Sequence, residues 1–168
     1  MSILQGNDLL KTVEAKIESQ LQPDTKANSD KIVNAGMKLA LAKGPDGILA
    51  SLKNSKDPVS DVVQGAIGIV GMLRREAHGA MPPKAMVPAA FVLMLHGLDF
   101  AQKLGVLKVD NAVLDQATQM FSEAMMRAMK ITPQMLDSLA QKVHGVTLDP
   151  QKMAQLQKTV PGGSDGTA

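Results

Sequence analysis

The chain of 168 residues contains no cysteine, no tryptophan and no tyrosine, and its three phenylalanines make up an aromatic content of only 2%. Without cysteine the chain forms no disulfide and offers no thiol for catalysis, which agrees with a reducing compartment. The shortage of aromatic rings argues against a stacking platform for single-stranded nucleic acid. These absences exclude thiol chemistry and weaken the case for binding single-stranded nucleic acid by base stacking.

An excess of charge of one sign is also missing. The 18 basic and 16 acidic residues are interspersed and give a formal net charge of +2, so we expect no specific nucleic-acid binding. No apolar run reaches the roughly 18–20 residues of a membrane-spanning helix. The N-terminus has neither the basic start nor the apolar core of a signal peptide. We therefore expect a chain that is not secreted by a signal peptide.

What the chain does contain is typical of a folded helical domain. Hydrophobic residues make up 45% and charged residues 20%, and no alternation of useful length indicates strands. The composition predicts one helical domain over residues 1–160 and a flexible tail over 161–168. The expected fold is all-α, a compact bundle of about seven or eight helices.

The segment 59–104 is expected to organise this bundle. It holds two apolar blocks, 62–73 and 86–95, joined by the breaker-rich link 78–83. Both blocks are apolar on nearly every side, so each is expected to lie inside the fold as one arm of a central helical hairpin. Pro88 implies that the second helix starts near residues 84–87 or is kinked there.

Capping residues predict where the helices begin and end. Asn7 or Asp8 caps a first helix that ends before Pro23, on which Lys11, Glu14 and Glu18 are expected to face water. A second helix is expected to begin near residues 28–30, and a short helix covers 46–53. Further helix starts are predicted at Asp57-Pro58, Asp110, Thr132-Pro133 and Asp149-Pro150, with Gly105 as a helix stop and short final helices at about 133–143 and 150–158.

Three glycines in the first apolar block are the most informative local feature. Gly65, Gly68 and Gly71 lie on the side of the predicted helix opposite its apolar stripe, beside Ile69 and Met72. Each weakens a helix by roughly 1 kcal/mol relative to alanine, so something should offset that cost. The block is interpreted as a core helix, as a subunit contact in which backbones approach closely, or as a membrane-inserting segment.

Two further segments offer candidate contact residues. The helix expected from Asp110 to about Lys130 has a broad apolar face rich in methionine, which is either core or an adaptable groove in which Met125 and Met129 contact a partner. Arg74 and Arg75 near the end of the glycine-containing helix suit the negative end of its dipole. They are candidates for binding a partner or a phosphate, with a solvated helix end as the plainer interpretation.

The sequence shows no local arrangement for catalysis or for a cofactor. It has no G-x-S-x-G motif and no phosphate-binding loop with its lysine. His96 and Asp99 have helical i, i+3 spacing and could reach one ion, but two ligands are too few for a metal site. Carboxylates distant in sequence could still meet in space. We expect no cofactor, no metal and no enzymatic activity.

The glycine-punctuated block 64–73, the methionine-rich segment 120–129 and the Pro-Gly-Gly-Ser tail at 161–164 resemble the small, cysteine-free helical proteins of bacteriophage particles. This resemblance lies in composition and residue patterns along the whole chain and includes no diagnostic motif. It implies a multicopy structural protein of the virion, in the neck, tail or genome-ejection machinery. The implied partners are copies of the chain or other virion proteins, and the implied location is the virion, otherwise the cytoplasm.

Two other functions remain open from the sequence. One is a membrane-active protein that inserts the apolar hairpin 62–95. The other is a soluble ligand-binding helical bundle that uses His96 and Asp99.

Overall fold

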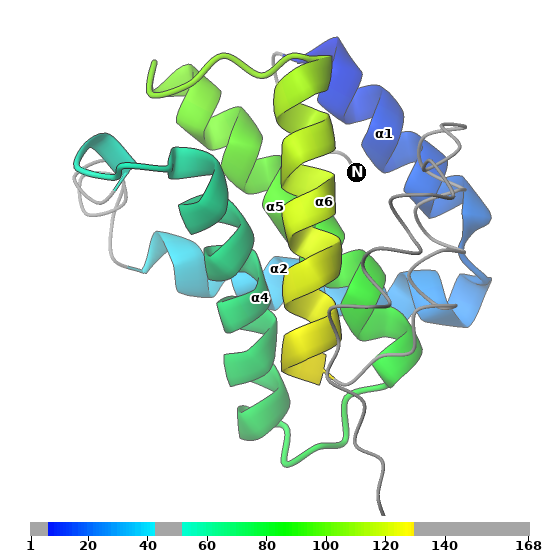
Figure 1. Ribbon diagram of the computed structural model, residues 1–168. Coiled ribbons are helices and arrows are strands. Elements are labelled where there is room, and N and C mark those ends of the chain that lie inside the picture. Colours follow the sequence, from blue (N-terminus) through cyan, green and yellow to red (C-terminus); the bar gives the residue numbers. More distant parts are fainter. Residues whose placement is uncertain (1–6, 43–51, 130–168) are drawn as a thin grey trace, which may run out of the picture.

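The computed structural model describes residues 7–42 and 52–129, which form five α-helices and no strand (Figure 1). The all-α prediction is confirmed for these residues, but the expected count of seven or eight helices is not matched. The helices expected at 133–143 and 150–158, the domain limit at 160 and the tail lie outside the described residues, as does almost all of 46–53. The five helices are α1 (Asp8–Gln20), α2 (Pro23–Leu41), α4 (Pro58–Glu76), α5 (Pro83–Lys103) and α6 (Asn111–Met129).

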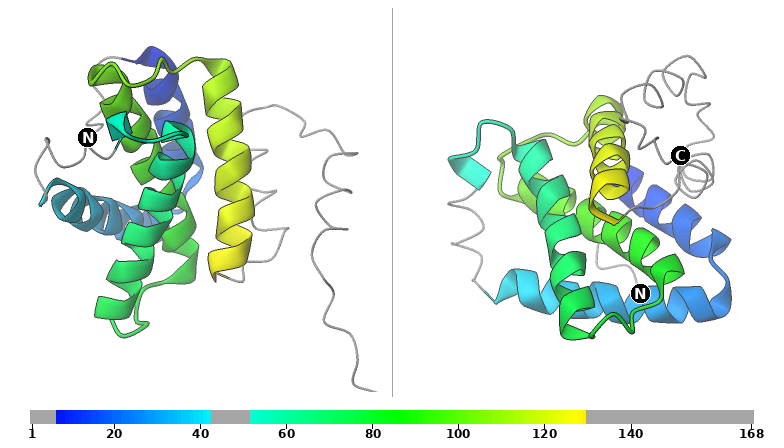
Figure 2. Two further views of the ribbon diagram at one scale, coloured as in Figure 1. Left: turned by 60° about the vertical axis from the view of Figure 1, so that its left-hand side comes forward. Right: turned by 60° about the horizontal axis from the view of Figure 1, so that its bottom comes forward.

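Helix α5 is the centre of the fold. Every residue from Ala85 to His96 is buried, and α2 and α6 lie on opposite sides of the α4–α5 pair (Figure 2). The ring of Phe91 in α5 meets that of Phe121 in α6 edge to face, with centroids 5.1 Å apart. This geometry suits the quadrupoles of two aromatic rings and joins α6, which packs mainly on α4, to α5. The prediction that the second apolar block lies inside the fold is therefore confirmed.

Helix α4 corrects the other half of that prediction. Its predicted stripe packs inward, and the buried members include Val63, Ala66 and Val70. Gly65 and Gly68 on the opposite side are exposed, and Met72 is 38% exposed. The block looks apolar all round because glycine carries no polar group, yet glycine contributes no side chain to bury. Both arms of the hairpin thus lie between α2 and α6, but one side of the first arm is exposed.

The predicted caps at three helix starts are confirmed. The side-chain oxygen of Asn7 accepts from the backbone N–H groups of Leu9 and Leu10 at 3.0 and 3.4 Å. Asp57 Oδ1 accepts from Ser60 N at 3.1 Å, with Pro58 as the first helical residue. Asp110 Oδ1 accepts from Val113 N at 3.0 Å. Each cap satisfies an amide that has no partner inside its helix.

The predicted start of the second helix, near residues 28–30, is wrong. Helix α2 begins at Pro23, directly after α1. Proline ends one helix and also suits the first position of the next, because that position needs no amide hydrogen. Lys26 of α2 joins the two helices, because its Nζ lies 3.0 Å from Glu18 of α1. The same Nζ lies 3.3 Å from Asp30 within α2. The hydrogen bond to Glu18 is the main reason that the pKa of Lys26 is raised above its usual value.

Helices α4 and α5 end in the same hydrogen-bonding motif with different residues at its critical position. At the end of α5, Gly105 N donates to Gln102 O and Val106 N to Ala101 O, and Gly105 has φ +68°. At the end of α4, His78 N donates to Arg75 O and Gly79 N to Arg74 O, with His78 at φ +50°. Both patterns are Schellman motifs, which require a left-handed residue. The stop at Gly105 was predicted, whereas the histidine in this position was not.

Helix α5 begins at Pro83, one residue before the predicted window, and continues through Pro88. Pro88 lacks the N–H that would bond the carbonyl of Lys84, four residues earlier. Since Lys84 is exposed, water can satisfy that carbonyl. This position near the N-terminal end lets the helix tolerate a proline.

Two buried contacts depend on glycine. A Cβ atom at Gly36 in α2 would lie 2.8 Å from Leu93 Cδ1, and one at Gly97 in α5 would lie 2.7 Å from Val62 Cγ1. Both distances are well below the 3.5–4.0 Å of favourable carbon–carbon contacts. The absent side chains therefore allow α2 and α4 to pack closely against α5.

Candidate functional site

The surface of α4 that faces away from the bundle is the candidate site, and we call it the open face of α4. It consists of Asp61, Gly65, Gly68, Met72 and Arg75, all of which are exposed. Their spacings of four, three, four and three residues keep them within an arc of about 80° on a helix that turns about 100° per residue. The open face therefore runs along nearly the full length of α4.

The glycines of α4 have no packing role among the described residues. A Cβ atom at Gly65, Gly68 or Gly71 would meet no atom of the described chain within 4 Å. This is the opposite of Gly36 and Gly97, where a Cβ would collide. Of the predicted contact residues, Gly65, Gly68 and Met72 share the open face, and Gly71 lies beside it.

Other predicted contact residues lie elsewhere. Ile69 is partly buried and its Cγ2 lies 3.0 Å from the Cβ position of Gly36, so it joins α4 to α2. Met125 is fully buried at 0% exposure and belongs to the core, so no partner can reach it on the folded bundle. The position of the Met129 side chain lies outside the described residues.

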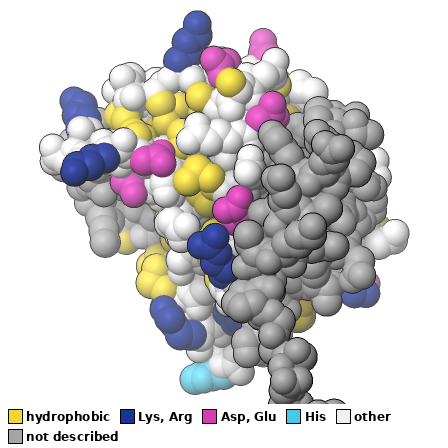
Figure 3. Space-filling model, viewed as in Figure 1, with side chains coloured by type: hydrophobic (Ala, Val, Ile, Leu, Met, Phe, Trp, Pro, Cys, Tyr) yellow, Lys and Arg dark blue, Asp and Glu magenta, His cyan; other side chains and the backbone are white. Residues whose placement is uncertain are grey.

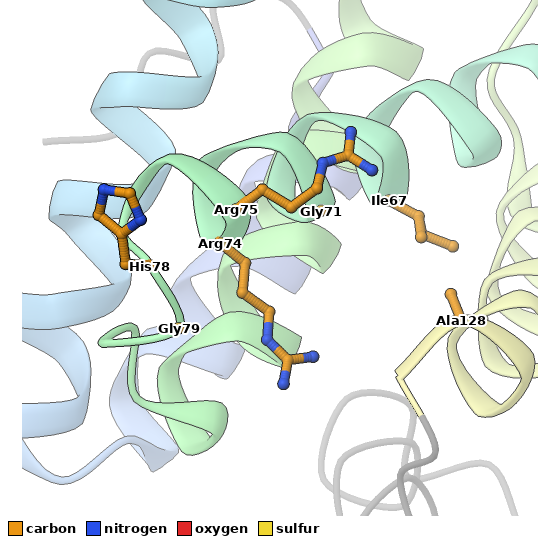
Figure 4. A pocket seen from close by; sticks show the side chains of 7 residues that line it. All are labelled: Ile67, Gly71, Arg74, Arg75, His78, Gly79 and Ala128. Carbon is orange, nitrogen blue, oxygen red and sulfur yellow. The ribbon is translucent and has the colours of Figure 1, made fainter.

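A hollow of about 430 Å³ opens beside the C-terminal end of the open face. It lies between α4 and the end of α6, and Ile67 and Ala128 face each other across it (Figure 4). The predicted phosphate candidates Arg74 and Arg75 line it with His78, but the three side chains point in different directions (Figure 4). Basic side chains and a histidine gather on the surface at this end of α4 (Figure 3). The hollow is basic, yet its charged groups do not converge on one anion.

His78 marks this end of α4 as locally strained. A non-glycine residue at positive φ is uncommon, and the left-handed conformation costs an L-residue roughly 1–2 kcal/mol. The Schellman hydrogen bonds hold His78 there. The turn thus keeps an exposed imidazole beside two arginines. A glycine in place of His78 would relieve the strain but would remove the imidazole.

A second polar group lies inside the bundle. His96 Nε2 is 2.9 Å from Glu14 Oε1, and the two residues are 6% and 3% exposed. This contact joins α5 to α1 and corrects the prediction that Glu14 faces water. The sequence contained a signal for it, because Glu14 lies four residues after Leu10 and three before Ile17, within the apolar stripe of α1.

Asp99, three residues after His96, is also buried and forms no metal site with the described residues. Its Oδ2 is 2.6 Å from Nζ of Lys103, while Oδ1, like Nδ1 of His96, has no hydrogen-bond partner among the described residues. Within 7–42 and 52–129, no group of three or more potential metal ligands is present. His96 is therefore better described as a buried polar link between α5 and α1, and Asp99 as the buried half of an ion pair within α5.

Comparisons with protein-family models, with curated proteins and with solved structures found no match to this chain.

Proposed function

We propose that the protein is a non-enzymatic assembly component, present in several copies, whose subunits contact one another through the open face of α4. The observation that supports this proposal is that three glycines lie on the side of α4 away from its buried stripe, where the described chain makes no use of their missing side chains. Glycine inside a helix costs about 0.5–1 kcal/mol relative to alanine. Three of them cost about 1.5–3 kcal/mol, a substantial part of the roughly 5–15 kcal/mol that stabilises a typical domain.

A second helix would use that space. Where a helix presents glycine, another backbone can approach closely, and the van der Waals packing between the two helices offsets the helical cost. Gly97 shows this compensation inside the bundle, because Val62 occupies the place of its side chain. By analogy, the open face is suited to receive a helix from another molecule, and exposed Met72 can adapt its shape to such a neighbour.

The resemblance to bacteriophage particle proteins supplies a setting for this assembly function. In the neck, tail or ejection machinery of a virion, many copies are held at high local concentration, so a modest contact per pair is sufficient. We propose the virion as the first place to look for the partner, with copies of this chain as the first candidates.

Membrane insertion is the weaker alternative. Among the described helices, α5 is long and apolar enough to cross a membrane by length and composition, but 83% of its apolar window is buried in the bundle. Insertion would require α5 to leave its contacts with α2, α4 and α6. The ligand-binding alternative is also weaker, because a ligand would have to reach two buried side chains, His96 and Asp99, that already contact Glu14 and Lys103.

The test is the mass of the protein in solution, measured by light scattering with and without lipid vesicles. The proposal predicts a discrete oligomer that ignores lipid and that Gly68→Leu dissociates, because the new side chain prevents close approach. The matched control is Ala27→Leu, which adds bulk at an exposed position of α2. A monomer at high micromolar concentration would overturn the proposal, and a monomer that binds vesicles would favour membrane insertion.

A further inference from the structure

The open face of α4 is complementary to itself. Asp61 lies seven residues before Gly68, and Arg75 lies seven residues after it. The face thus carries a negative charge at one end and a positive charge at the other, and between them two glycines without side chains and Met72. A surface with this symmetry matches a second copy of itself when that copy is turned end to end.

Both charges are available for such a match. The carboxylate of Asp61 and the guanidinium of Arg75 form no ion pair within the described parts of the chain, and both residues are exposed. Many charges of this bundle are instead paired locally, as Glu123 is with Arg127 at 3.6 Å.

We propose that two copies of the chain pair through antiparallel α4 helices about a two-fold axis that passes close to Gly68. This inference rests on the proposed assembly function and specifies its geometry. In this arrangement Asp61 of each copy faces Arg75 of the second copy, and Gly65 faces Gly71. Met72 of each copy lies over the Gln64–Gly65 step of the other, where glycine leaves room for the thioether.

The parallel arrangement is unfavourable for the same residues. It would place Asp61 against Asp61 and Arg75 against Arg75, and like charges across an interface reduce affinity. It would also align the two helix dipoles in the same direction, whereas antiparallel dipoles attract. The charge pattern therefore selects one orientation from the two that the glycines allow.

The expected affinity is modest. One pair of 19-residue helices buries less surface than the roughly 1,200–2,000 Å² of a stable complex. We expect a dissociation constant on the order of micromolar.

Charge reversal tests the orientation. In the antiparallel dimer, Asp61→Lys and Arg75→Glu each place like charges together at both ends, so each should weaken dimerisation about tenfold or more, measured by sedimentation equilibrium. The double variant on one chain restores opposite charges and should regain wild-type affinity. The matched controls are Asp24→Lys in the first turn and Lys38→Glu in the last turn of α2, which should not affect the dimer.

Disulfide crosslinking tests the same register with both charges intact. The chain has no cysteine of its own, so Gln64→Cys and Met72→Cys are clean single-thiol variants. Antiparallel pairing brings residue 64 of one copy to residue 72 of the other, so mixing the two variants should give a crosslinked heterodimer. Either variant alone should crosslink poorly, because its thiols lie eight residues apart along the paired helices, about 12 Å, beyond the ~7 Å Cα limit of a disulfide.

The outcomes separate this inference from the assembly function. Rescue by the double reversal together with crosslinking in the mixture supports antiparallel pairing. A wild-type oligomer that Gly68→Leu dissociates but charge reversal does not affect, or in which each thiol variant crosslinks alone, overturns the antiparallel geometry and leaves assembly through α4 standing. A wild-type monomer overturns both.

Discussion

Helices α4 and α5 are neighbours in sequence and similar in length, at 19 and 21 residues, yet they differ in how their glycines and ends are used. In α5, Gly97 makes room for Val62, and Gly105 supplies the left-handed residue of the helix end. In α4, no described residue occupies the space beside the three glycines, and His78 occupies the strained position. The glycines of α5 favour the folded bundle, whereas those of α4 do not. Such conflicts between local sequence and fold are typical of functional surfaces.

The largest change in the free energy of unfolding is expected from a substitution at the centre of α5. Leu95→Ala removes a side chain with 0% exposure and leaves a cavity, so we expect a loss of about 2–5 kcal/mol in the free energy of unfolding. Met72→Ala on the open face is the comparison, with an expected change within about 0.5 kcal/mol for the monomer. Urea denaturation at low protein concentration measures both. Equal losses would mean that the open face is packed after all.

Adding a single methyl group at Gly97 of α5 should lower the stability of the protein. Gly97→Ala brings a Cβ to 2.7 Å from Val62 Cγ1, and overpacking of this kind costs about 1–3 kcal/mol. Val62→Ala removes the obstacle, so the double variant should lose less stability than the sum of the single variants. Denaturant titration of the three variants gives the coupling energy. Additive losses would show that Gly97 matters for a reason other than Val62.

Replacing a glycine of α4 with alanine should raise the stability of the monomer, whereas the same replacement in α5 lowers it. Gly68→Ala fills open space and improves helix propensity, so we expect the monomer to gain about 0.5–1 kcal/mol. The same change should weaken self-association, because the methyl group separates the paired backbones. Thermal unfolding at low concentration and light scattering at high concentration measure the two effects. A variant that is more stable and associates as well as the wild type would contradict a close contact at this position.

The smallest effect is expected at the end of α4. His78→Gly relieves the positive φ of His78, which costs about 1–2 kcal/mol. Glycine loses about 0.5–1 kcal/mol more in backbone entropy on folding, so the net gain in stability should be up to about 1 kcal/mol. Gly105→Ala at the equivalent position of α5 is the reciprocal control and should destabilise by a similar amount. Chemical denaturation of both variants gives the comparison. A loss of stability in His78→Gly would mean that the imidazole makes a contact worth more than the strain.

Local signals allowed much of the fold to be predicted. The caps at Asn7, Asp57 and Asp110 and the stop at Gly105 act within a few residues, and the structure contains all four. The signal for the missed helix start at Pro23 was also local, because one proline marks both the end of α1 and the beginning of α2. Glu14 was missed because a charged residue in an apolar stripe was assigned to water, although a buried histidine can satisfy it.

The candidate site was only partly predictable. The sequence offered Gly65, Gly68 and Met72 as candidate contact residues, but it grouped them with Ile69 and Met125, which pack against or within the core. Ile69 and Met72 differ by three residues and lie on the same half of the helix, so periodicity alone does not separate them. Their different environments depend on where α2 crosses α4.

Sequence alone was enough to predict that the described part of the chain is helical, where most of its helices begin and end, and that the segment around Phe91 is buried. These properties follow from hydrogen bonding and apolar content along a single helix. Which glycines are packed and which are open became visible only once the helices were placed against one another. A glycine has no side chain to mark its surroundings, so its role depends on whether another helix occupies the space beside it. Val62 occupies that space at Gly97, and no described residue occupies it at Gly68.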